Sequence, residues 1–244
     1  MNSANPSPAF RPLYQQIKIL ITQSLISGEW RPGEAIPSEI DLAARYNVSQ
    51  GTVRKAISEL SDENLLIRHQ GKGTFVASHT EQRRLFHFVR VFSDQGGAIY
   101  PGGELMECKR GKADSATAKL LEINHGASLH IIRRLLKEGT QPVLLEEIRL
   151  PAALFKGLDE EVINQHQCKV YSMFESAFGI RIIQVVEQLK AVAANREAAA
   201  HLNVDEGAPL LCIERVAYTY GDKPVEWRKS LCNSKRHHYM NKIV

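Results

Sequence analysis

Polar side chains gather at the start of one short amphipathic segment in the first third of the chain. Its apolar residues recur at the i, i+3, i+4 and i+7 spacing of a single helix face, namely Val53, Ala56, Ile57 and Leu60. The residues left largely outward at and after the helix start are Ser49, Gln50, Thr52, Arg54 and Lys55. When a helix enters the major groove, donors near its N-terminus reach base edges, and its first amides favour a phosphate. The pattern therefore indicates a surface that can bind nucleic acid.

Two further helices are predicted ahead of this one. The apolar residues of the first recur at helical spacing, namely Leu13, Ile17, Leu20, Ile21 and Leu25. Gly28 ends that helix. Ser38 and Asp41 have the spacing of a capping box and open a second, short helix. The residues that the second helix is expected to bury are Leu42, Ala43 and Tyr46. Ser49 is positioned to cap the third.

A β-hairpin is predicted directly after the three helices. Two short apolar strands, residues 65–67 and 74–76, are separated by a basic turn over residues 68–73. Lys72 stands between Gly71 and Gly73, so it can closely approach a groove or a phosphate backbone. Residues 78–84 are polar throughout and predict a linker, which gives an N-terminal domain over residues 1–77 and a C-terminal domain over residues 85–244.

The C-terminal part contains an internal repeat. Residues 121–134 align with residues 202–215 at a constant offset of 81, and each copy reads as a helix end, a glycine turn and a strand. Two such units predict a pseudo-symmetric α+β domain around one antiparallel sheet. Elsewhere the patterns predict a strand over 85–92, a glycine-rich loop over 93–103, a helix over 169–178 ended by Gly179, and a strand over 180–192.

The composition is that of an ordinary globular protein. The 244 residues are 43% hydrophobic and 24% charged, with a net charge of +4, so basic residues must act through local arrangement. The four cysteines, Cys108, Cys168, Cys212 and Cys232, lie far apart, which predicts reduced thiols. The N-terminal residues do not have the pattern of a signal peptide, and no apolar run has the length of a transmembrane helix. We expect a cytoplasmic protein with no membrane partner.

Other chemical signals are weak. His237 and His238 are adjacent, and adjacent side chains on a regular element do not readily ligate one ion. The Gly96-Gly97 and Gly102-Gly103 pairs lack the strand and helix context of a nucleotide site. No motif for nucleophilic catalysis is present. The sequence therefore predicts no catalytic residue, no metal site and no cofactor.

Several motifs occur in one order over residues 12–76: PLYQQI at 12–17, PSE at 37–39, VSQGTVRKA at 48–56 and GKGTFV at 71–76. In spacing and order, this segment resembles the DNA-binding domain of GntR-family transcriptional regulators. The resemblance implies a winged helix-turn-helix fold and a double-stranded DNA operator as the partner.

The rest of the chain resembles the HutC-type branch of that family, whose C-terminal effector domain is called UTRA. The features that carry the resemblance are Ile132 to Arg134, Pro142, Glu146, Pro151, Tyr171, the 202–215 run and Lys223 to Glu226. The resemblance implies a chorismate-lyase-like α+β fold with a central antiparallel sheet. It also implies a homodimer, most often a repressor, whose binding to the operator is controlled by a small metabolite.

The resemblance assigns the DNA contacts to Ser38, Ile40, Gln50, Thr52, Arg54 and Gly71. The helix and hairpin patterns add Lys55 and Lys72. Ile40 and Gln50 stand where family members commonly have arginine, the usual bidentate reader of guanine. Glutamine can read adenine instead, and isoleucine can make only an apolar contact, so the operator is expected to differ from the usual one. In a dimer, the two half-sites would be centred roughly 34–36 Å apart.

The resemblance assigns the effector site to Arg134, Glu146, Tyr171, Arg181, Arg236 and Tyr239. Guanidinium groups bind carboxylates or phosphates in a fork, and a tyrosine hydroxyl adds orientation. The prediction is a small anionic effector. Relatives that sense sugar phosphates have a second arginine where this chain has Leu136, so a carboxylate or a nitrogenous metabolite is equally compatible. Arg134 has the alternative of a surface strand residue, and for Arg215, its equivalent in the repeat, that alternative is favoured.

Two other functions compete with a regulator. The C-terminal domain shares its expected fold class with a lyase, so an enzyme acting on a small carboxylic acid is one alternative, although fold analogy is weak support for activity. The other alternative is an architectural DNA-binding protein, which would show little sequence preference and no response to a ligand.

Overall fold

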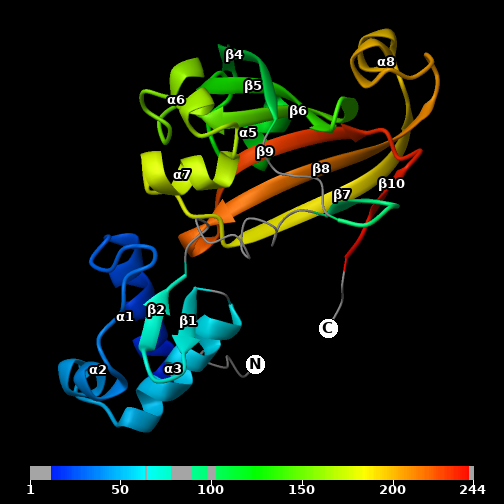
Figure 1. The fold of residues 1–244 in the computed structure, drawn as a ribbon. Coiled ribbons are helices and arrows are strands. Elements are labelled where there is room, and N and C mark those ends of the chain that lie inside the picture. The colour runs from blue at the N-terminus through cyan, green and yellow to red at the C-terminus, as the bar shows by residue number, and fades with distance from the viewer. Residues whose placement is uncertain (1–11, 64, 78–89, 98–102, 242–244) are drawn as a thin grey trace, which may run out of the picture. The chain divides into compact units, whose positions relative to one another are not determined.

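A computed structural model describes residues 12–63, 65–77, 90–97 and 103–241, and the chain divides into two units, residues 1–78 and 79–244. The N-terminal unit contains three helices and a hairpin: α1 (Leu13–Ile26), α2 (Glu39–Tyr46), α3 (Gln50–Asp62), β1 (Leu66–His69) and β2 (Gly73–Val76) (Figure 1). All of the predicted elements of this unit are present. The predicted linker, residues 78–84, lies outside the described residues.

The core of the N-terminal unit comes mainly from α1 and α3, which pack against each other. The buried apolar side chains of these two helices are Ile17, Ile21, Leu25, Val53, Ala56, Ile57 and Leu60. The predicted face of α3 is therefore confirmed. Leu13 and Leu20, which belong to the same helical repeat of apolar residues on α1, lie outside this buried set and are 50% and 40% exposed.

Two side-chain caps fix where α2 and α3 begin. The Ser38 hydroxyl accepts a hydrogen bond from the Asp41 amide (3.2 Å), and the Asp41 carboxylate accepts one from the Ser38 amide (3.2 Å). This is the predicted capping box. Ser49 caps α3 by accepting a hydrogen bond from the Thr52 amide (3.2 Å). On α2 only Leu42 is buried, while Ala43 and Tyr46, which were expected to be buried, are half-buried.

The hairpin is slightly longer than predicted. β1 pairs with β2 in antiparallel register from Leu66 opposite Val76 to His69 opposite Gly73. Gly71 and Gly73 have φ angles of 72° and 107°, a region that glycine enters without steric cost. A bridge from Ala35 to Phe75 adds a third stretch of chain to this small sheet.

The C-terminal unit is built on one antiparallel sheet of six strands. Their order is β4 (Glu104–Lys112), β5 (Ser128–Glu138), β6 (Gln141–Pro151), β9 (Lys223–Cys232), β8 (Pro209–Thr219) and β7 (Gln184–Ala193). A separate ribbon pairs β3 (Val91–Ser93) with β10 (His237–Tyr239). The predicted α+β class and antiparallel sheet are confirmed.

The internal repeat corresponds to two equivalent halves of the sheet. One half runs β4, α5 (Ser115–Leu120), β5 and β6, and the other runs β7, α8 (Arg196–Leu202), β8 and β9. Asp114 caps α5 and Asn195 caps α8, at the same offset of 81 residues that relates the sequences. The two halves meet where β6 pairs with β9. The repeat-related strands β5 and β8 therefore lie on either side of this central pair.

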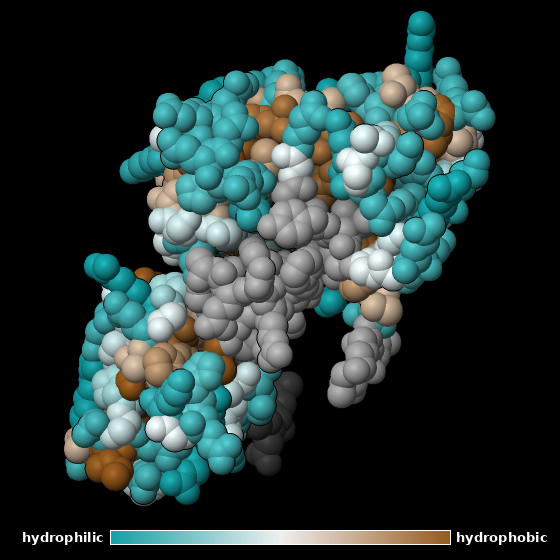
Figure 2. Space-filling view, in the orientation of Figure 1, coloured by the Kyte–Doolittle hydropathy of each residue, from teal (hydrophilic) through white to brown (hydrophobic). Residues whose placement is uncertain are grey.

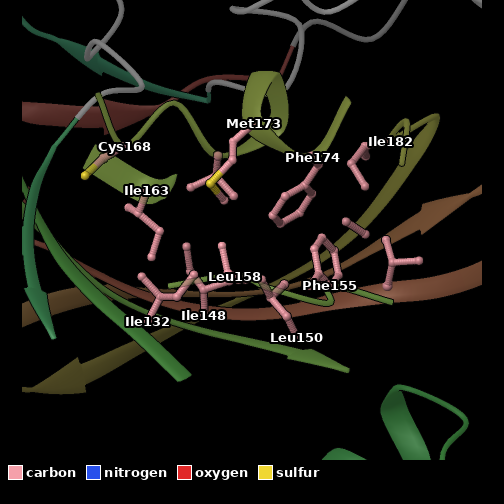
Figure 3. Packing of buried hydrophobic residues seen from close by; sticks show 13 residues of the cluster. Ile132, Ile148, Leu150, Phe155, Leu158, Ile163, Cys168, Met173, Phe174 and Ile182 are labelled. Carbon is pink, nitrogen blue, oxygen red and sulfur yellow. The ribbon is translucent and has the colours of Figure 1, made fainter. Parts of the chain in front are cut away.

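Helices cover both faces of this sheet. On one face α5 packs against Leu129 and Trp227, and α8 packs against Leu145 and Leu210. On the opposite face lie α6 (Glu160–Gln165) and α7 (Val170–Phe178). Met173 and Phe174 of α7 point toward Ile148 and Leu150 of the sheet (Figure 3). A short 3₁₀ helix, η1 (Tyr220–Asp222), connects β8 to β9.

Some predicted boundaries shift. The helix over 169–178 is confirmed as α7, and Gly179 ends it with a φ angle of 65°. The strand predicted over 180–192 begins later, at Gln184. Of the strand predicted over 85–92, residues 85–89 lie outside the described residues and β3 covers 91–93. Residues 98–102 of the glycine-rich loop also lie outside them.

The visible surface of the described residues is mostly hydrophilic, with hydrophobic residues in separate patches (Figure 2). None of the helices in the described ranges has the length and apolar character needed to cross a membrane.

A buried histidine on β5 predicts a pH-dependent stability of the C-terminal unit. Burial, with a smaller contribution from the Arg110 charge on β4, lowers the pKa of His130, and a hydrogen bond with the Phe155 backbone opposes this. His130 is 1% exposed and its Nε2 atom has no hydrogen-bond partner in the described structure.

Because the folded protein disfavours the charged imidazole, the free energy of unfolding should fall as the pH drops below about 6.5, the ordinary histidine pKa. Urea titrations of a Trp30→Phe protein between pH 7.5 and 5.5, followed by the fluorescence of the remaining tryptophan, Trp227, measure this decrease. His130→Gln should flatten the profile over that range. An equally steep profile for the variant would assign the pH dependence to other groups.

Candidate functional site

The polar residues predicted on α3 divide into two groups in the structure. Gln50 and Arg54 are one helical turn apart, are exposed, and both contact the Glu39 carboxylate of α2. Thr52 is half-buried, and its hydroxyl lies 2.9 Å from the Ser49 hydroxyl. The Lys55 ammonium packs 3.9 Å from the centroid of the Tyr14 ring on α1. Gln50 and Arg54 therefore form an exposed pair beside Glu39, while Lys55, also exposed, packs toward α1.

Glu39 connects α2, α3 and the hairpin. Its carboxylate accepts hydrogen bonds from Arg54 Nε (2.8 Å), Gln50 Nε2 (3.4 Å) and an Arg68 guanidinium nitrogen on β1 (3.3 Å). Arg68 also donates to the Arg54 carbonyl (3.1 Å). One carboxylate thus fixes two arginines and a glutamine in place. Glu39 and Arg68 were not among the predicted site residues, although the PSE motif and the basic turn contained them.

Removing the Glu39 charge is expected to weaken discrimination between DNA sequences. Glu39→Gln retains an acceptor for Arg54 but removes a negative charge that opposes phosphates. We expect the variant to bind a scrambled duplex more tightly. The plot of the logarithm of the binding constant against the logarithm of the salt concentration should have a slope that is more negative by about 0.9 for each additional phosphate contact. Fluorescence anisotropy of the full chain over a salt series measures both quantities.

The matched control for Glu39→Gln is Glu29→Gln. It removes an exposed carboxylate of the same unit that pairs with Arg45 instead. If the two variants bind the scrambled duplex with the same affinity and salt dependence, Glu39 has no specific role in limiting phosphate contacts.

The remaining predicted DNA residues lie at the helix start and at the hairpin tip. Ser38 is the N-cap of α2, directly before Glu39. Ile40, the next residue, is exposed. Gly71 and Lys72 are exposed in the turn between β1 and β2, where the Lys72 amide donates to the His69 carbonyl (3.0 Å). The structure thus brings Ser38, Gln50 and Arg54 together through the first turns of α2 and α3, and Lys72 projects from a separate loop.

A second polar group, the buried charge cluster, lies on the C-terminal sheet face that also carries α6 and α7. Its members are Arg134, Glu146, Tyr171, Glu187, Arg215, Glu226, Arg228, Ser230 and Tyr239. Arg134 on β5 lies directly opposite Glu146 on β6, and its Nε atom donates to Glu146 Oε2 (2.7 Å). The surface alternative for Arg134 is excluded, because this residue is only 2% exposed. Its guanidinium also donates to the Cys168 carbonyl.

Strand β9 extends the cluster across the centre of the sheet. Ser230 donates to Glu146 Oε1 (2.7 Å), and the Arg228 guanidinium approaches Glu146 Oε2 at 3.4 Å. Arg228 Nε donates to Glu226 Oε1 (2.6 Å). The other oxygen, Glu226 Oε2, is buried and has no hydrogen-bond partner in the described part of the chain. Since an unsatisfied buried acceptor costs free energy, this oxygen is suited to a donor supplied from outside the protein.

Strand β8 and helix α7 complete the cluster. Arg215 Nε donates to Glu187 Oε1 (2.8 Å), and an Arg215 guanidinium nitrogen donates to the Tyr171 hydroxyl (3.2 Å). The Tyr171 ring lies under the Arg228 guanidinium at 5.2 Å. Tyr239 of β10 donates its hydroxyl to Glu187. The expectation that Arg215 is a surface residue was wrong: its side chain is buried because β8 turns it toward the same sheet face as Arg134.

Two other predicted effector residues lie apart from the cluster. Arg181 is buried, and its guanidinium donates to the Tyr220 hydroxyl at 3.3 Å. Arg236 is exposed, and its backbone carbonyl accepts a hydrogen bond from the Asp94 amide. The structure thus joins four of the six predicted residues, Arg134, Glu146, Tyr171 and Tyr239.

Sequence reasoning missed four charged members of the cluster, Glu187, Arg215, Glu226 and Arg228. The repeat contained a signal for two of them. Arg215 is the equivalent of Arg134, and Arg228 follows Pro224-Val225 at the distance that separates Glu146 from Pro142-Val143.

The electrostatics of the cluster follow from charges that burial brings together. The Arg134 and Arg228 charges overcome burial and lower the pKa of Glu146 to about 2. Burial, together with the nearby Glu226 charge, raises the pKa of Tyr171, so its hydroxyl stays protonated. Three arginines, Arg134, Arg215 and Arg228, thus face three carboxylates, Glu146, Glu187 and Glu226, with little water around them.

In the described ranges, no three His, Cys, Asp or Glu side chains are grouped to hold an ion. His237 lies 3.1 Å from Glu138, and His238 lies 2.8 Å from Asp94, so the two adjacent histidines have different acidic partners.

A capped helix that presents Gln50 and Arg54, followed by a glycine-containing hairpin, defines a winged helix-turn-helix DNA-binding domain. Joined to a separate sheet domain with a buried polar site, it defines a ligand-responsive DNA-binding protein as a class. Comparison with known families agrees. Residues 13–76 match the family of bacterial regulatory proteins of the gntR type, and residues 98–238 match the UTRA domain.

The relatives give the same assignment over the whole chain. The HTH-type transcriptional repressor NagR of Bacillus subtilis is 30% identical over 247 aligned residues, and the alignment covers the full length of both chains. A probable fructoselysine utilization operon transcriptional repressor of Escherichia coli is 30% identical and covers 96% of each chain. The protein therefore belongs to the GntR family, as a transcriptional regulator of the HutC type with a UTRA domain.

Solved structures support the fold. The ligand-binding domain of a GntR-family regulator from Bordetella bronchiseptica is 35% identical, with a TM-score of 0.61, and covers 65% of this chain and 98% of that one. PhnF from Mycobacterium smegmatis, 24% identical with a TM-score of 0.55, covers 93% and 99% of the two chains.

Proposed function

We propose that this protein is a homodimeric repressor in the cytoplasm that releases or binds its operator in response to a small metabolite held at the buried charge cluster. The observation that carries the proposal is the pairing of two sites in one chain. One is the Glu39-centred group of Gln50, Arg54 and Arg68. The other is the set of three buried arginines and three buried carboxylates on the C-terminal sheet.

The charges of the cluster define the chemistry of the effector. Each of the three arginines already has a carboxylate partner, so a ligand bearing only negative charge would leave its own charge uncompensated in a buried site. Glu226 Oε2 supplies an acceptor that lacks a donor. We therefore propose an effector with two kinds of group. An anionic group would lie near Arg134, and an ammonium, amide or hydroxyl donor would bind the open acceptor on Glu226.

The relatives are named for different compounds, including fructoselysine, histidine and mannosyl-D-glycerate, at identities of 27–30%. The proposed effector contacts are therefore taken from this chain: Arg134, Glu146 and Tyr171 from the sequence, with Glu226 and Arg228 added by the geometry.

Tyr239 connects the cluster to the ribbon formed by β3 and β10. It belongs to β10, whose only described strand partner is β3, the first described strand after the linker residues. A ligand that changes the Glu187–Arg215 pair would change the acceptor of the Tyr239 hydroxyl. A ligand shifts the equilibrium between the operator-binding and the non-binding arrangement of the dimer only through its different affinity for these two arrangements.

The proposal is tested by fluorescence anisotropy with the full chain, its own upstream DNA and a scrambled duplex at two salt concentrations. Tight binding to the upstream DNA with a clear margin over the scramble supports a sequence-specific regulator. Equal and steeply salt-dependent binding to both duplexes would instead indicate phosphate contacts alone.

The same assay screens metabolites that carry both an anionic and a donor group. Glu226→Gln should lose the response while retaining DNA binding. Light scattering measures the oligomeric state. The lyase-like enzyme predicts turnover of the bound metabolite, which chromatography of the incubated mixture would detect.

A further inference from the structure

Ile40 is the most exposed large hydrophobic side chain in the described parts of the chain, at 67%. It is the second residue of α2, between Glu39 and Asp41. Glu39 contacts Gln50 and Arg54 on the outward part of α3. An isoleucine with no part in the core therefore lies beside the polar residues that are proposed to contact DNA.

The charged neighbours of Ile40 are both held by the protein. Glu39 pairs with Arg54 and Arg68, and Asp41 completes the capping box with Ser38. Neither carboxylate is free to extend beyond the helix start. The isoleucine side chain is left as the group that projects from the first turn of α2.

Helix geometry gives the direction of this projection. Leu42, two residues later, is 0% exposed in the core. Successive helical residues are separated by about 100° around the axis, so Ile40 and Leu42 lie on nearly opposite sides. Ile40 therefore points away from the core at the end of α2 where Glu39 contacts α3.

An aliphatic side chain cannot donate a hydrogen bond to guanine. The apolar group that bases present in the major groove is the thymine C5-methyl. We propose that Ile40 contacts a thymine methyl and that, with Gln50 near an adenine, it gives this protein a preference for A·T base pairs. This specificity rests on the proposed function, because it requires α3 to enter the major groove of an operator.

The test removes the methyl group from DNA and the side chain from the protein. The full chain selects a preferred duplex from a random pool, and each thymine of that duplex is then replaced singly by deoxyuridine, which lacks only the C5-methyl. For the wild type we expect one thymine in each half-site where the replacement weakens binding about four-fold, the effect of one buried methylene-sized group. Ile40→Ala should bind the thymine and deoxyuridine duplexes equally well.

Ile26→Ala is the matched control, because Ile26 is 57% exposed on α1 of the same unit. It should retain the full deoxyuridine effect, and circular dichroism of both variants checks the helical content. A wild type that is insensitive to every replacement, or an Ile40→Ala protein that keeps the same sensitivity, overturns the proposal for Ile40 alone. A pool that yields no preferred sequence overturns the proposed function and the Ile40 contact with it.

Discussion

Replacing Glu146 by alanine should lower the free energy of unfolding of the C-terminal domain by about 3–5 kcal/mol, the usual cost of removing one partner of a buried ion pair. Glu146 is 5% exposed and accepts hydrogen bonds from Arg134, Arg228 and Ser230. Without it, two buried guanidinium groups lose a shared counter-charge. Urea unfolding in a Trp30→Phe background measures the effect, because the remaining tryptophan, Trp227, lies in this domain.

The matched control for Glu146→Ala is Lys190→Ala. Lys190 pairs with Glu214 at 3.9 Å and its side chain is 60% exposed, so its loss should have little effect. Equal unfolding curves for Glu146→Ala and Lys190→Ala would show that the buried pairs do not stabilise the domain.

The acid dependence of Glu146 differs from that of His130. The pKa of Glu146 is lowered from 4.5 to about 2, so its contribution to stability is complete above pH 4.5 and is lost as the pH falls toward 2. The decrease expected from His130 begins near pH 6.5. Unfolding measured between pH 7.5 and 5.5 therefore reports on His130 while Glu146 stays ionised.

Replacing Arg54 by alanine is expected to weaken operator binding by about 5- to 150-fold, or 1–3 kcal/mol, the range for one base-contacting arginine. The Arg54 side chain is 59% exposed, yet the Glu39 carboxylate fixes its position. Less conformational entropy is then lost when the guanidinium meets a base. Anisotropy titrations against the operator and a scrambled duplex measure the loss and show whether it is specific to the operator.

Arg45→Ala provides the control for charge alone. Arg45 is also an exposed arginine of the N-terminal unit, but it lies in the last turn of α2 and pairs with Glu29. Its loss should leave operator affinity nearly unchanged. If Arg54→Ala and Arg45→Ala bind the operator equally well, Arg54 makes no base contact.

The DNA-binding unit could be predicted closely from the sequence because its determinants are local. The spacing of Val53, Ala56, Ile57 and Leu60 defines one helix face, and the caps at Ser38 and Ser49 act over three residues. The GntR motifs added the roles of Gln50 and Arg54. The role of Glu39 was not predicted, because its three partners lie 11, 15 and 29 residues away.

The effector domain was predictable in outline but not in its site. The repeat at an offset of 81 indicated two equivalent halves around one sheet, and the structure has them. It could not show that Arg215 is buried. Which face a strand residue occupies depends on the pairing register, and a shift of one residue moves every side chain to the other face.

The fold classes of the two units, helix α3 and the family could therefore be predicted from the sequence, since they depend on short-range periodicity, caps, the internal repeat and contiguous motifs. The composition of the buried charge cluster depends instead on which strands are neighbours in the sheet. Arg134 and Arg228 are 94 positions apart in the numbering, and both reach Glu146 because β5, β6 and β9 are neighbours in the sheet. Burial then strengthens the interactions between these charges and leaves Glu226 Oε2 without a hydrogen-bond partner among the described residues, a property that no single segment contains.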